Sequence, residues 1–484
     1  MKYHLISLGC QMNQSDSERV KTVVEKMGYE WTDREEDACL LGLIACSVRQ
    51  KAIDKVYSKI RYWNQLKEKN NLITFISGCI LPSDRERFLK LFDIIFTMNE
   101  LPKLPEFIHH YGVVTPAALS VIPADLFEEE ESSLLKNQTK AQESKKESTN
   151  VLYKGPHLGQ NRSTTKVKPE QNIENFWDLS PQYSSPFEAY VPIQNGCDKF
   201  CTFCAVPYTR GREVSRSSEE IISEVKSLVN KGYKSITLLG QNVNSYGNDK
   251  NGKELSFDKL LAEIGEYGNQ SEKKFWLYFT SPHPRDMTTD VIRTIAKYDC
   301  IANQIHLPLQ SGDDKMLIRM NRKHSLSDYR DIINDINIFI PDAIIFTDII
   351  IGFTGETEEQ FENTRAALDE FKFNMAYIAL YSPRPGAASS RWNDDVPHEV
   401  KKKRFKILTE QLRKNYRELN LSKVGKIQKV LVRNIAKKEG YLSGLTEGKI
   451  IVRFPSTNKS IIGLFVDVKI TSVSTFSMEG VLVE

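Results

Sequence analysis

Three cysteines stand close together in the stretch GCDKFCTFC, at Cys197, Cys201 and Cys204. A structural zinc site normally has four protein ligands, and no other Cys or His stands nearby to supply the fourth. A [4Fe–4S] cluster held by three thiolates instead leaves one iron open to an exogenous ligand. The spacing C-x3-C-x2-C therefore favours such a cluster, and its alternatives are a zinc site or unligated core thiols.

A second set of cysteines is spread over the first eighty residues, at Cys10, Cys46 and Cys79. Each follows one of three short apolar runs, which are residues 3–8, 40–45 and 72–77, and a fourth such run covers 92–97. Runs of this kind predict parallel strands that are buried on both faces. Because parallel strands end at one edge of a sheet, where doubly wound folds build their sites, we expect these thiols to gather there.

Six further candidate strands follow, separated by amphipathic helical segments. They cover residues 189–194, 235–240, 275–280, 303–309, 344–351 and 375–380. This alternation predicts a partial β/α barrel of six strands, with its functional face at the carboxyl ends of the strands. Short β segments with turn signals fill the last sixty residues and predict a small antiparallel β-barrel.

The chain is therefore expected to have four parts and to belong to the α/β class. They are a doubly wound parallel α/β domain (1–112), a polar insert or linker (113–182), the partial β/α barrel (183–421) and the small antiparallel barrel (422–484). Residues 124–175 are mostly polar or charged, so they cannot bury enough surface to offset their ordering entropy. We expect that segment to be mobile, with one short helix at 126–135.

The formal net charge is only +3, but residues 399–438 hold fourteen Lys and Arg against three Glu. This excess suggests a polyanionic partner such as nucleic acid, and the alternative is a solvated helix face. The first residues lack the pattern of a signal peptide, and the most apolar stretch, 38–48, is too short to span a membrane. We expect a cytoplasmic monomer with no membrane partner, whose grouped cysteines are metal or redox ligands.

The C-x3-C-x2-C stretch resembles the radical S-adenosylmethionine (SAM) enzymes. The resemblance implies that the open iron binds SAM, and that an electron passing through the cluster cleaves SAM to a 5′-deoxyadenosyl radical. By their positions after the barrel strands, eight residues are candidate SAM contacts, and the alternative for each is a turn or packing role. They are Gly240, Gln241, Asn242, Ser281, His283, Gln310, Ser311 and Gly352.

Other stretches look like the methylthiotransferases within that superfamily. The text SLGCQMNQSDSE, IACSVRQKA and SGCILP is similar to their N-terminal domain, in which three cysteines bind an auxiliary [4Fe–4S] cluster, and the C-terminal segment is similar to the RNA-binding TRAM domain. The stretches LLGQNVNSYG, FTSPHPRDM, HLPLQSGDDKMLIRMNRKHS and YSPRPGAAS match the branch that acts on tRNA, the MiaB type. The chain departs from the family pattern G-F-P-G-E at Thr354, which puts the stiffness of that loop in doubt.

The resemblance implies two [4Fe–4S] clusters, SAM, and addition of a methylthio group to C2 of N6-isopentenyladenosine at position 37, in the anticodon stem-loop of tRNA. Two SAM molecules are used, one for methylation of sulfur and one for the radical. An electron donor of the flavodoxin or ferredoxin type is implied, and the sulfur donor is not indicated. The alternatives are a methylthiotransferase of threonylcarbamoyladenosine tRNA or of ribosomal protein S12, and a non-catalytic RNA-binding metalloprotein.

Basic residues near the cysteines and in the basic segment are candidate tRNA contacts, because Arg and Lys bind phosphate. They are Arg210, Arg212, Arg216, Lys401, Lys402, Lys403 and Arg404. The first three are also candidates for the SAM carboxylate, and the alternative is exposure with no specific partner. Tyr208 is expected to stack on a flipped base or to pack.

The remaining polar and cysteine candidates have weaker signals. His306 and Asp348 are expected near the barrel end, where either could be a satisfied core residue, and Cys39 and Cys300 are expected to be structural. No side-chain acid or base is expected to be catalytic, because an aromatic C–H carries no acidic proton for it to remove.

Overall fold

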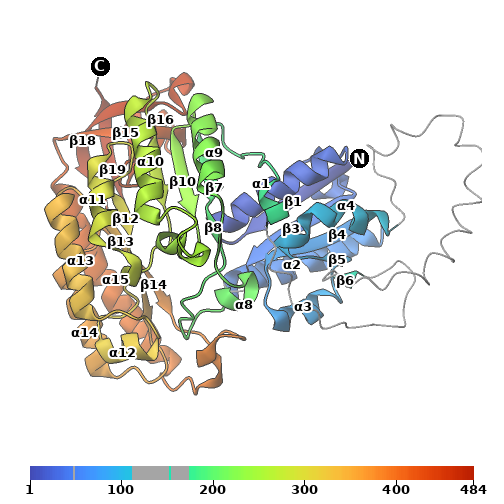
Figure 1. Cartoon of the computed structure of the whole chain (residues 1–484), viewed down its shortest axis with the longest axis horizontal. Coiled ribbons are helices and arrows are strands. Elements are labelled where there is room, and N and C mark those ends of the chain that lie inside the picture. Colours follow the sequence, from blue (N-terminus) through green and yellow to red (C-terminus); the bar gives the residue numbers. More distant parts are fainter. Residues whose placement is uncertain (47–49, 112–151, 154–173, 484) are drawn as a thin grey trace, which may run out of the picture. The chain divides into compact units, whose positions relative to one another are not determined.

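The structure, a computed structural model, describes residues 1–46, 50–111, 152–153 and 174–483 (Figure 1). Two compact units make up the chain. The first unit comprises Met1–Gln182 and Tyr208–Gly211, and the second comprises Tyr183–Pro207 and Arg212–Glu484. The predicted mobile insert and its short helix at 126–135 lie almost entirely outside the described residues, so both stay predictions.

The first unit is built on a six-stranded sheet with the order β2-β1-β3-β4-β5-β6. All neighbouring strands are parallel except β5 and β6. The strands are β1 (Lys2–Leu8), β2 (Glu30–Trp31), β3 (Leu40–Cys46), β4 (Ile73–Cys79), β5 (Ile94–Ile95) and β6 (Leu152–Tyr153). The helices are α1 (Gln11–Lys26), α2 (Gln50–Lys67), α3 (Pro82–Phe88), α4 (Leu104–His109) and α7 (Glu174–Trp177), with short turns η1 (Glu35–Asp37) and η2 (Met98–Lys103).

This sheet confirms the predicted doubly wound parallel domain. Every residue of β3 is buried, as its uninterrupted apolar sequence predicts for a central parallel strand. The strand order reverses between β1 and β3, because the chain first adds β2 on one side of β1 and then β3 on the other. Such a reversal opens a crevice at the carboxyl ends of the strands, which is where doubly wound folds bind ligands.

The second unit contains two three-stranded parallel sheets, β11-β10-β7 and β12-β13-β14. A parallel bridge between Leu277 and Ile301 connects them, so the six strands form the predicted partial barrel. The strands are β7 (Glu188–Pro192), β10 (Ser235–Leu239), β11 (Trp276–Phe279), β12 (Gln304–His306), β13 (Ile344–Ile351) and β14 (Met375–Leu380).

Helices pack against the outer face of these strands through one continuous apolar core (Figure 1). They are α9 (Ser218–Asn230), α10 (Phe257–Gln270), α11 (Thr289–Lys297), α13 (Leu326–Phe339) and α14 (Glu358–Phe371). Two short helices, α8 (Val206–Arg210) and α12 (Asp314–Arg319), and the turns η4 (Val243–Ser245), η5 (Asn248–Lys250), η6 (Pro284–Asp286) and η7 (Ala388–Arg391) lie in the segments between the strands and after β14. The predicted basic segment forms the long helix α15 (His398–Leu421).

A closed five-stranded barrel of order β15-β16-β17-β19-β18 ends the chain and confirms the predicted small barrel. Its strands are β15 (Ile427–Ile435), β16 (Tyr441–Thr446), β17 (Ile451–Pro455), β18 (Phe465–Val473) and β19 (Ser477–Leu482), with turn η8 (Lys459–Ile461). Its core includes Ile344 and Phe346 from the start of β13. The small barrel therefore covers the amino-terminal ends of the β/α barrel strands.

None of the helices in the described part of the chain is long and apolar enough to cross a membrane.

Candidate functional site

The three clustered cysteines lie on one loop that follows β7, at the carboxyl end of the partial barrel. A two-stranded ribbon of β8 (Gln194–Asn195) and β9 (Val214–Ser215) closes this loop. Gly196 begins the loop with a φ of +82°, a conformation that favours glycine. Its N–H donates to Gln241 Oε1 at 2.6 Å, so the side chain after β10 ties the loop to the strand edge.

The far side of the cysteine loop is held by the turn that follows α12. The Thr202 N–H donates to the Met320 carbonyl at 3.0 Å, and its hydroxyl donates to the Arg319 carbonyl at 2.9 Å. Asn321 Nδ2 donates to the Phe200 carbonyl at 2.9 Å. The loop is thus fixed by hydrogen bonds from two separate elements, which suits a site that must hold several thiols in one geometry.

The thiols of this loop fit a thiolate-bound cluster. Cys197 and Cys201 are buried and Cys204 is half-buried. Burial, to which the neighbouring Cys204 and Glu213 add, raises the pKa of Cys197 to about 12. Such a thiol stays protonated on its own, and iron binding would displace the proton. Among the described residues, no three Cys, His, Asp or Glu side chains are arranged to hold a single metal ion.

The other three cysteines lie at the carboxyl ends of three neighbouring strands, where their apolar runs predict them. Cys10 lies between β1 and α1, and Cys46 and Cys79 end β3 and β4 as direct neighbours in the sheet register. A hydrogen bond with Cys46, followed by burial, raises the pKa of Cys79. These strands lie next to the reversal of strand order between β1 and β3, so the three thiols lie at the same carboxyl edge of the sheet, where the crevice opens.

Asn13, which the sequence analysis did not single out, lies among these three cysteines and is fully buried. Its Oδ1 accepts the Cys10 N–H at 3.3 Å, and its Nδ2 donates to the Ala45 carbonyl at 3.2 Å and lies 4.0 Å from Cys79 Sγ. Gly78 has a φ of +104°, and a Cβ there would lie 2.4 Å from the Ala45 carbonyl oxygen. The glycines preceding Cys10 and Cys79 were the signal in the sequence for this close packing.

Arg210 was expected to contact tRNA, but it is buried in the first unit. Its Nε donates to Cys79 Sγ at 2.9 Å, and its guanidinium pairs with the fully buried carboxylate of Asp16. An arginine with a buried carboxylate and a thiol as partners does not face a phosphate in solvent. Arg210 therefore lies beside the N-terminal thiols, and the tRNA contact at this residue stays a prediction.

The candidate SAM residues after β10 join a polar cluster next to the cysteine loop. Asn242 is buried, and its Nδ2 donates to Asp286 Oδ2 at 3.0 Å. Lys199, from the cysteine loop, pairs with the same Asp286 oxygen at 2.6 Å. Gly240 is buried, and a Cβ there would lie 3.1 Å from Val243 Cα, which is a packing constraint.

His283, after β11, is the candidate whose environment best fits a ligand. Its Nδ1 accepts the Arg285 N–H at 3.2 Å, while its buried Nε2 has no hydrogen-bond partner among the described residues. Burial, to which the positive charge of Arg322 adds, lowers its pKa, so the imidazole is neutral. Ser281, two residues earlier, is exposed and has a φ of +59°.

The candidates after β12 and β13 divide into two groups. Gln310 is buried with a φ of +73°, and its Oε1 has no hydrogen-bond partner within the described chain, so it can accept from a ligand. Ser311 Oγ instead lies 3.2 Å from Thr364 Oγ1 and accepts the Asp313 N–H, which indicates a structural role. Gly352 has a φ of +66°, and a Cβ there would lie 2.4 Å from Lys401 Cγ, so it serves a tight turn.

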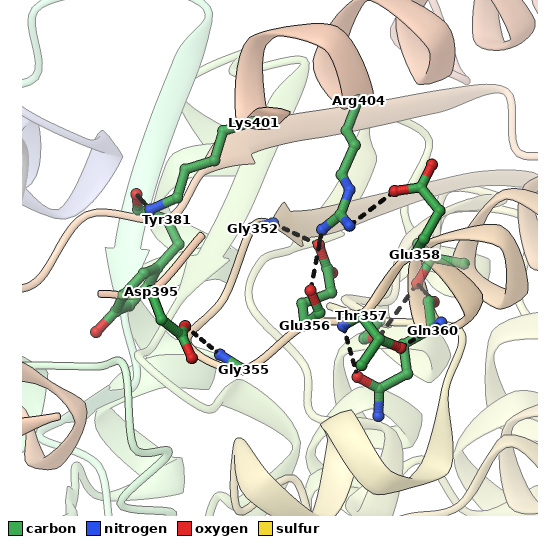
Figure 2. A network of polar contacts seen from close by, with 12 residues as sticks. Gly352, Gly355, Glu356, Thr357, Glu358, Gln360, Tyr381, Asp395, Lys401 and Arg404 are labelled. Atoms are coloured by element: carbon green, nitrogen blue, oxygen red, sulfur yellow. Dashed lines mark hydrogen bonds and ion pairs between the residues drawn. The ribbon is translucent and has the colours of Figure 1, made fainter. Parts of the chain in front are cut away.

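The turn after β13 is joined to α15 by the polar network in Figure 2. Arg404 is buried, and its Nη1 donates to Glu356 Oε2 at 2.6 Å while its Nη2 donates to Glu358 Oε2 at 2.9 Å. Lys401 Nζ is buried between the Tyr381 carbonyl, at 3.1 Å, and Asp394. The buried basic side chains of α15 therefore neutralise the charge of carboxylates in the same unit.

Four of the seven residues predicted to contact tRNA form ion pairs with buried or neighbouring carboxylates. They are Arg210, Arg216, Lys401 and Arg404, of which Arg216 pairs with Glu220 and Glu224. Lys402 and Lys403 are exposed on α15. Arg212 is also mainly exposed, 3.3 Å from Asp198 and with its guanidinium 4.9 Å from the Phe200 ring centroid.

The departure from the family pattern at Thr354 is accommodated by hydrogen bonds. Its hydroxyl is buried and has no hydrogen-bond partner among the residues described. The next residue, Gly355, donates its N–H to Asp395 Oδ1 at 2.7 Å, and Gly352 donates to Glu356 Oε2 at 2.7 Å (Figure 2). These bonds restrain a loop that lacks the rigid proline.

The remaining candidates have these surroundings. Tyr208 is exposed. His306 Nε2 lies 2.9 Å from Asp348 Oδ2, and both side chains are half-buried. Cys300 packs against Gly268, and burial raises the pKa of the Cys300 thiol to about 11. Cys39 donates to the Lys2 carbonyl at 3.3 Å. Both cysteines stand apart from the two triads and fit structural roles.

Comparisons with known proteins agree with this architecture. The radical SAM superfamily matches residues 191–368, the uncharacterized protein family UPF0004 matches 2–98, and the TRAM domain matches 421–483. The structure of the radical SAM methyltransferase TsrM from Kitasatospora setae is similar with a TM-score of 0.51, over 80% of this chain and 75% of that chain. At 12% sequence identity this likeness concerns the fold alone.

Several curated relatives share the full length of the chain, and each is called tRNA-2-methylthio-N(6)-dimethylallyladenosine synthase. The protein of Dictyoglomus thermophilum is 36% identical, over 99% of this chain and 98% of its own length. That of Clostridium botulinum strain Langeland is 36% identical, over 99% and 96%, and that of Thermoanaerobacter pseudethanolicus is 35% identical, over 100% and 93%. The chain therefore belongs to the family of tRNA-2-methylthio-N(6)-dimethylallyladenosine synthases.

Proposed function

We propose that this protein adds a methylthio group to C2 of N6-isopentenyladenosine at position 37 of tRNA. The observation that carries the proposal is the pair of cysteine triads, each at the carboxyl edge of its own parallel sheet. The full-length similarity to synthases named for this product supports the same substrate. The TRAM match and the exposed basic residues support an RNA partner.

The radical SAM superfamily implies a [4Fe–4S] cluster and SAM, and we assign these to the second unit. Cys197, Cys201 and Cys204 would hold the cluster, and its open iron would bind SAM. When bound, this pair supplies the radical chemistry that removes hydrogen from an aromatic carbon. His283 Nε2 and Gln310 Oε1 are buried and have no hydrogen-bond partner among the described residues, and we propose that they hydrogen-bond to SAM.

We propose that Cys10, Cys46 and Cys79 hold a second [4Fe–4S] cluster, which makes two in the chain. Asn13 would keep the three strand ends in place through its hydrogen bonds to the Cys10 N–H and the Ala45 carbonyl. Arg210 would donate to the Cys79 sulfur. The chemistry of this site, in our proposal, is to provide the sulfur that is methylated and transferred.

For tRNA we propose the three basic side chains that stay exposed, Arg212, Lys402 and Lys403, together with the small C-terminal barrel. We further propose that the enzyme is a cytoplasmic monomer that receives electrons from a donor of the flavodoxin or ferredoxin type. The predicted boundaries of the four parts, at residues 112, 182 and 421, are kept as part of this proposal.

The test separates the triads. Replacing Cys197, Cys201 and Cys204 with Ala should abolish SAM cleavage and leave about half of the iron and sulfide of the anaerobically purified protein. Replacing Cys10, Cys46 and Cys79 with Ala should keep SAM cleavage and abolish methylthiolation. Full product formation by either triple variant would refute the two-cluster assignment.

The substrate is tested with tRNA that carries isopentenyladenosine and, in parallel, with tRNA that carries threonylcarbamoyladenosine. Methylthiolation of the first and not the second is the expected result. Product on the second alone would assign the chain to the other tRNA activity. Protein that contains zinc but no sulfide would refute the radical mechanism.

A further inference from the structure

Arg322 is a buried arginine next to the cysteine loop of the second unit. It follows α12 in the stretch RMNRKHS, and its side chain is almost wholly shielded from solvent. Its Nη1 lies 3.4 Å from Cys201 Sγ, and its Nη2 donates to the Pro308 carbonyl at 2.8 Å. Its Nε is buried and has no hydrogen-bond partner in the described part of the chain.

No carboxylate among the described residues forms an ion pair with Arg322. Within the described ranges, the ion pairs of the second unit do not include Arg322, although the other buried arginines of that unit, Arg216 and Arg404, each pair with two glutamates. Leaving a guanidinium in the interior without an anionic partner is unfavourable. The arrangement therefore calls for an anion on the side of the guanidinium that faces Cys201.

The neighbouring histidines do not supply that anion, and they also carry no positive charge that would add to the imbalance. The His283 and His324 rings are 5.6 Å apart and both are buried. Burial is the main cause that lowers the pKa of both, to about 4 for His324, and the charge of Arg322 lowers each further. Of Arg322, His283 and His324, the guanidinium is thus the one side chain that carries a charge at neutral pH.

Arg210 in the first unit provides an internal comparison. It also donates to a thiol of a triad, Cys79, at 2.9 Å. However, its charge is already balanced by the buried carboxylate of Asp16. The contact between a buried arginine and one cysteine sulfur therefore occurs in both units, while an unbalanced positive charge occurs at the Cys201 contact.

We propose that Arg322 is a positioning residue that holds the Cys201 sulfur and supplies the counter-charge for the cluster of Cys197, Cys201 and Cys204. Three thiolates bring negative charge to such a cluster, and one-electron reduction adds more. A nearby cation and a hydrogen bond to sulfur stabilise the reduced state more than the oxidised state, which raises the reduction potential. The electron comes from a low-potential flavin or iron–sulfur donor. This inference rests on the cluster assignment under Proposed function.

The experiment uses the full chain with Cys10, Cys46 and Cys79 replaced by Ala, so that a single cluster remains. In this parent we would introduce Arg322→Gln, Arg322→Lys and, as a matched control, Arg319→Gln. Arg319 is an exposed arginine three residues earlier on the same helix end. The reduced cluster is measured by electron paramagnetic resonance during a redox titration with dithionite, and iron and sulfide are measured per chain.

We expect Arg322→Gln to lower the ratio of reduced to oxidised cluster about tenfold at the parent midpoint, which corresponds to about 59 mV for one electron. Arg322→Lys should restore most of the potential, and Arg319→Gln should leave it unchanged. If the Arg322→Gln variant loses its iron, the Arg322→Lys variant tests the inference in its place. A reduction potential of Arg322→Lys near that of the parent supports the role of Arg322, and loss of iron from Arg322→Lys overturns it.

An unchanged potential in Arg322→Gln with full iron content overturns the inference and leaves the cluster assignment intact. A parent that contains no iron and sulfide, or whose signal does not respond to SAM, instead refutes the proposed function itself. The two failures are therefore distinguishable.

Discussion

Replacing Arg404 with Met should destabilise the turn after β13 far more than replacing the adjacent Lys403 with Met. The side chains of Arg404 and Glu356 are almost fully buried, with exposed fractions of 5% and 0%. Removing one partner of a buried ion pair costs about 3–5 kcal/mol, because the other charge stays buried. The second contact of Arg404, to the largely exposed Glu358, adds at most about 1 kcal/mol.

The assay is hydrogen exchange at the turn, because Gly352 donates its N–H to Glu356 in the same network (Figure 2). A loss of about 3–5 kcal/mol corresponds to a fall in protection of roughly 10²- to 10⁴-fold. Lys403→Met, at an exposed position, should change stability by no more than about 0.5 kcal/mol. The double variant Arg404→Met with Glu356→Gln should recover part of the loss, because no carboxylate is left buried.

The loss of stability caused by Arg404→Met should also depend on pH. Burial raises the pKa of Glu356, against the opposing effects of the Gly352 N–H and Arg404. A carboxyl group with a raised pKa in the folded state favours folding at low pH and loses that contribution as pH rises through the folded pKa. Without Arg404 this pKa should rise further, so the deficit of Arg404→Met should be smaller near pH 5 than near pH 8.

The reasoning is refuted if Arg404→Met exchanges like Lys403→Met and instead weakens tRNA binding. That result would place the Arg404 side chain toward RNA and not toward Glu356.

Three further predictions concern other parts of the chain. Replacing both Lys402 and Lys403 with Gln should weaken tRNA binding and reduce the slope of log K against log salt concentration by about one to two units. Filter binding at several salt concentrations measures this slope, and an unchanged slope would show that neither lysine contacts RNA. The Asn13→Ala variant should lose iron from the N-terminal triad, so that up to about half of the total iron disappears while SAM cleavage persists. Full iron content in this variant would contradict the role of Asn13 in holding the three strand ends. Lys449→Met should stabilise the second unit at neutral pH, because burial lowers the pKa of Lys449 to about 8, where its ammonium lies 4.2 Å from the Tyr278 ring centroid. The gain in the free energy of unfolding should reach about 3 kcal/mol at neutral pH and vanish as pH rises from 8 past 10. A gain that is independent of pH would argue for packing alone.

The strands and the positions of the six cysteines could be predicted because both follow from local patterns. The uninterrupted apolar run of β3 marks a central parallel strand, and a residue that follows such a run must lie at the carboxyl edge. The contacts of single polar side chains could not be predicted in this way. Asn13 acquires its role because three strand ends, far apart in the sequence, come together around it.

The number of basic residues in a segment likewise does not predict the contacts of each one, as helix α15 shows. The sequence predicted α15 and its charge, but it does not show which lysines and arginines face inward. The carboxylate that pairs with Arg404 is contributed by Glu356, from another element of the unit. Arg322 was overlooked for the related reason that its neighbour Cys201 is distant in the chain.

The small C-terminal barrel is joined to the barrel strands as a structural part of the second unit. Its core encloses the side chains of Ile344 and Phe346, the ring of Phe465 lies 4.5 Å from that of Trp276, and a Cβ on Gly448 would collide with Ile344. A truncation after α15 would uncover these apolar groups, so the shortened enzyme would aggregate before its affinity for RNA could be measured. Exchange of this module between enzymes, in the laboratory or in evolution, must therefore preserve its packing against the residues that begin β11 and β13.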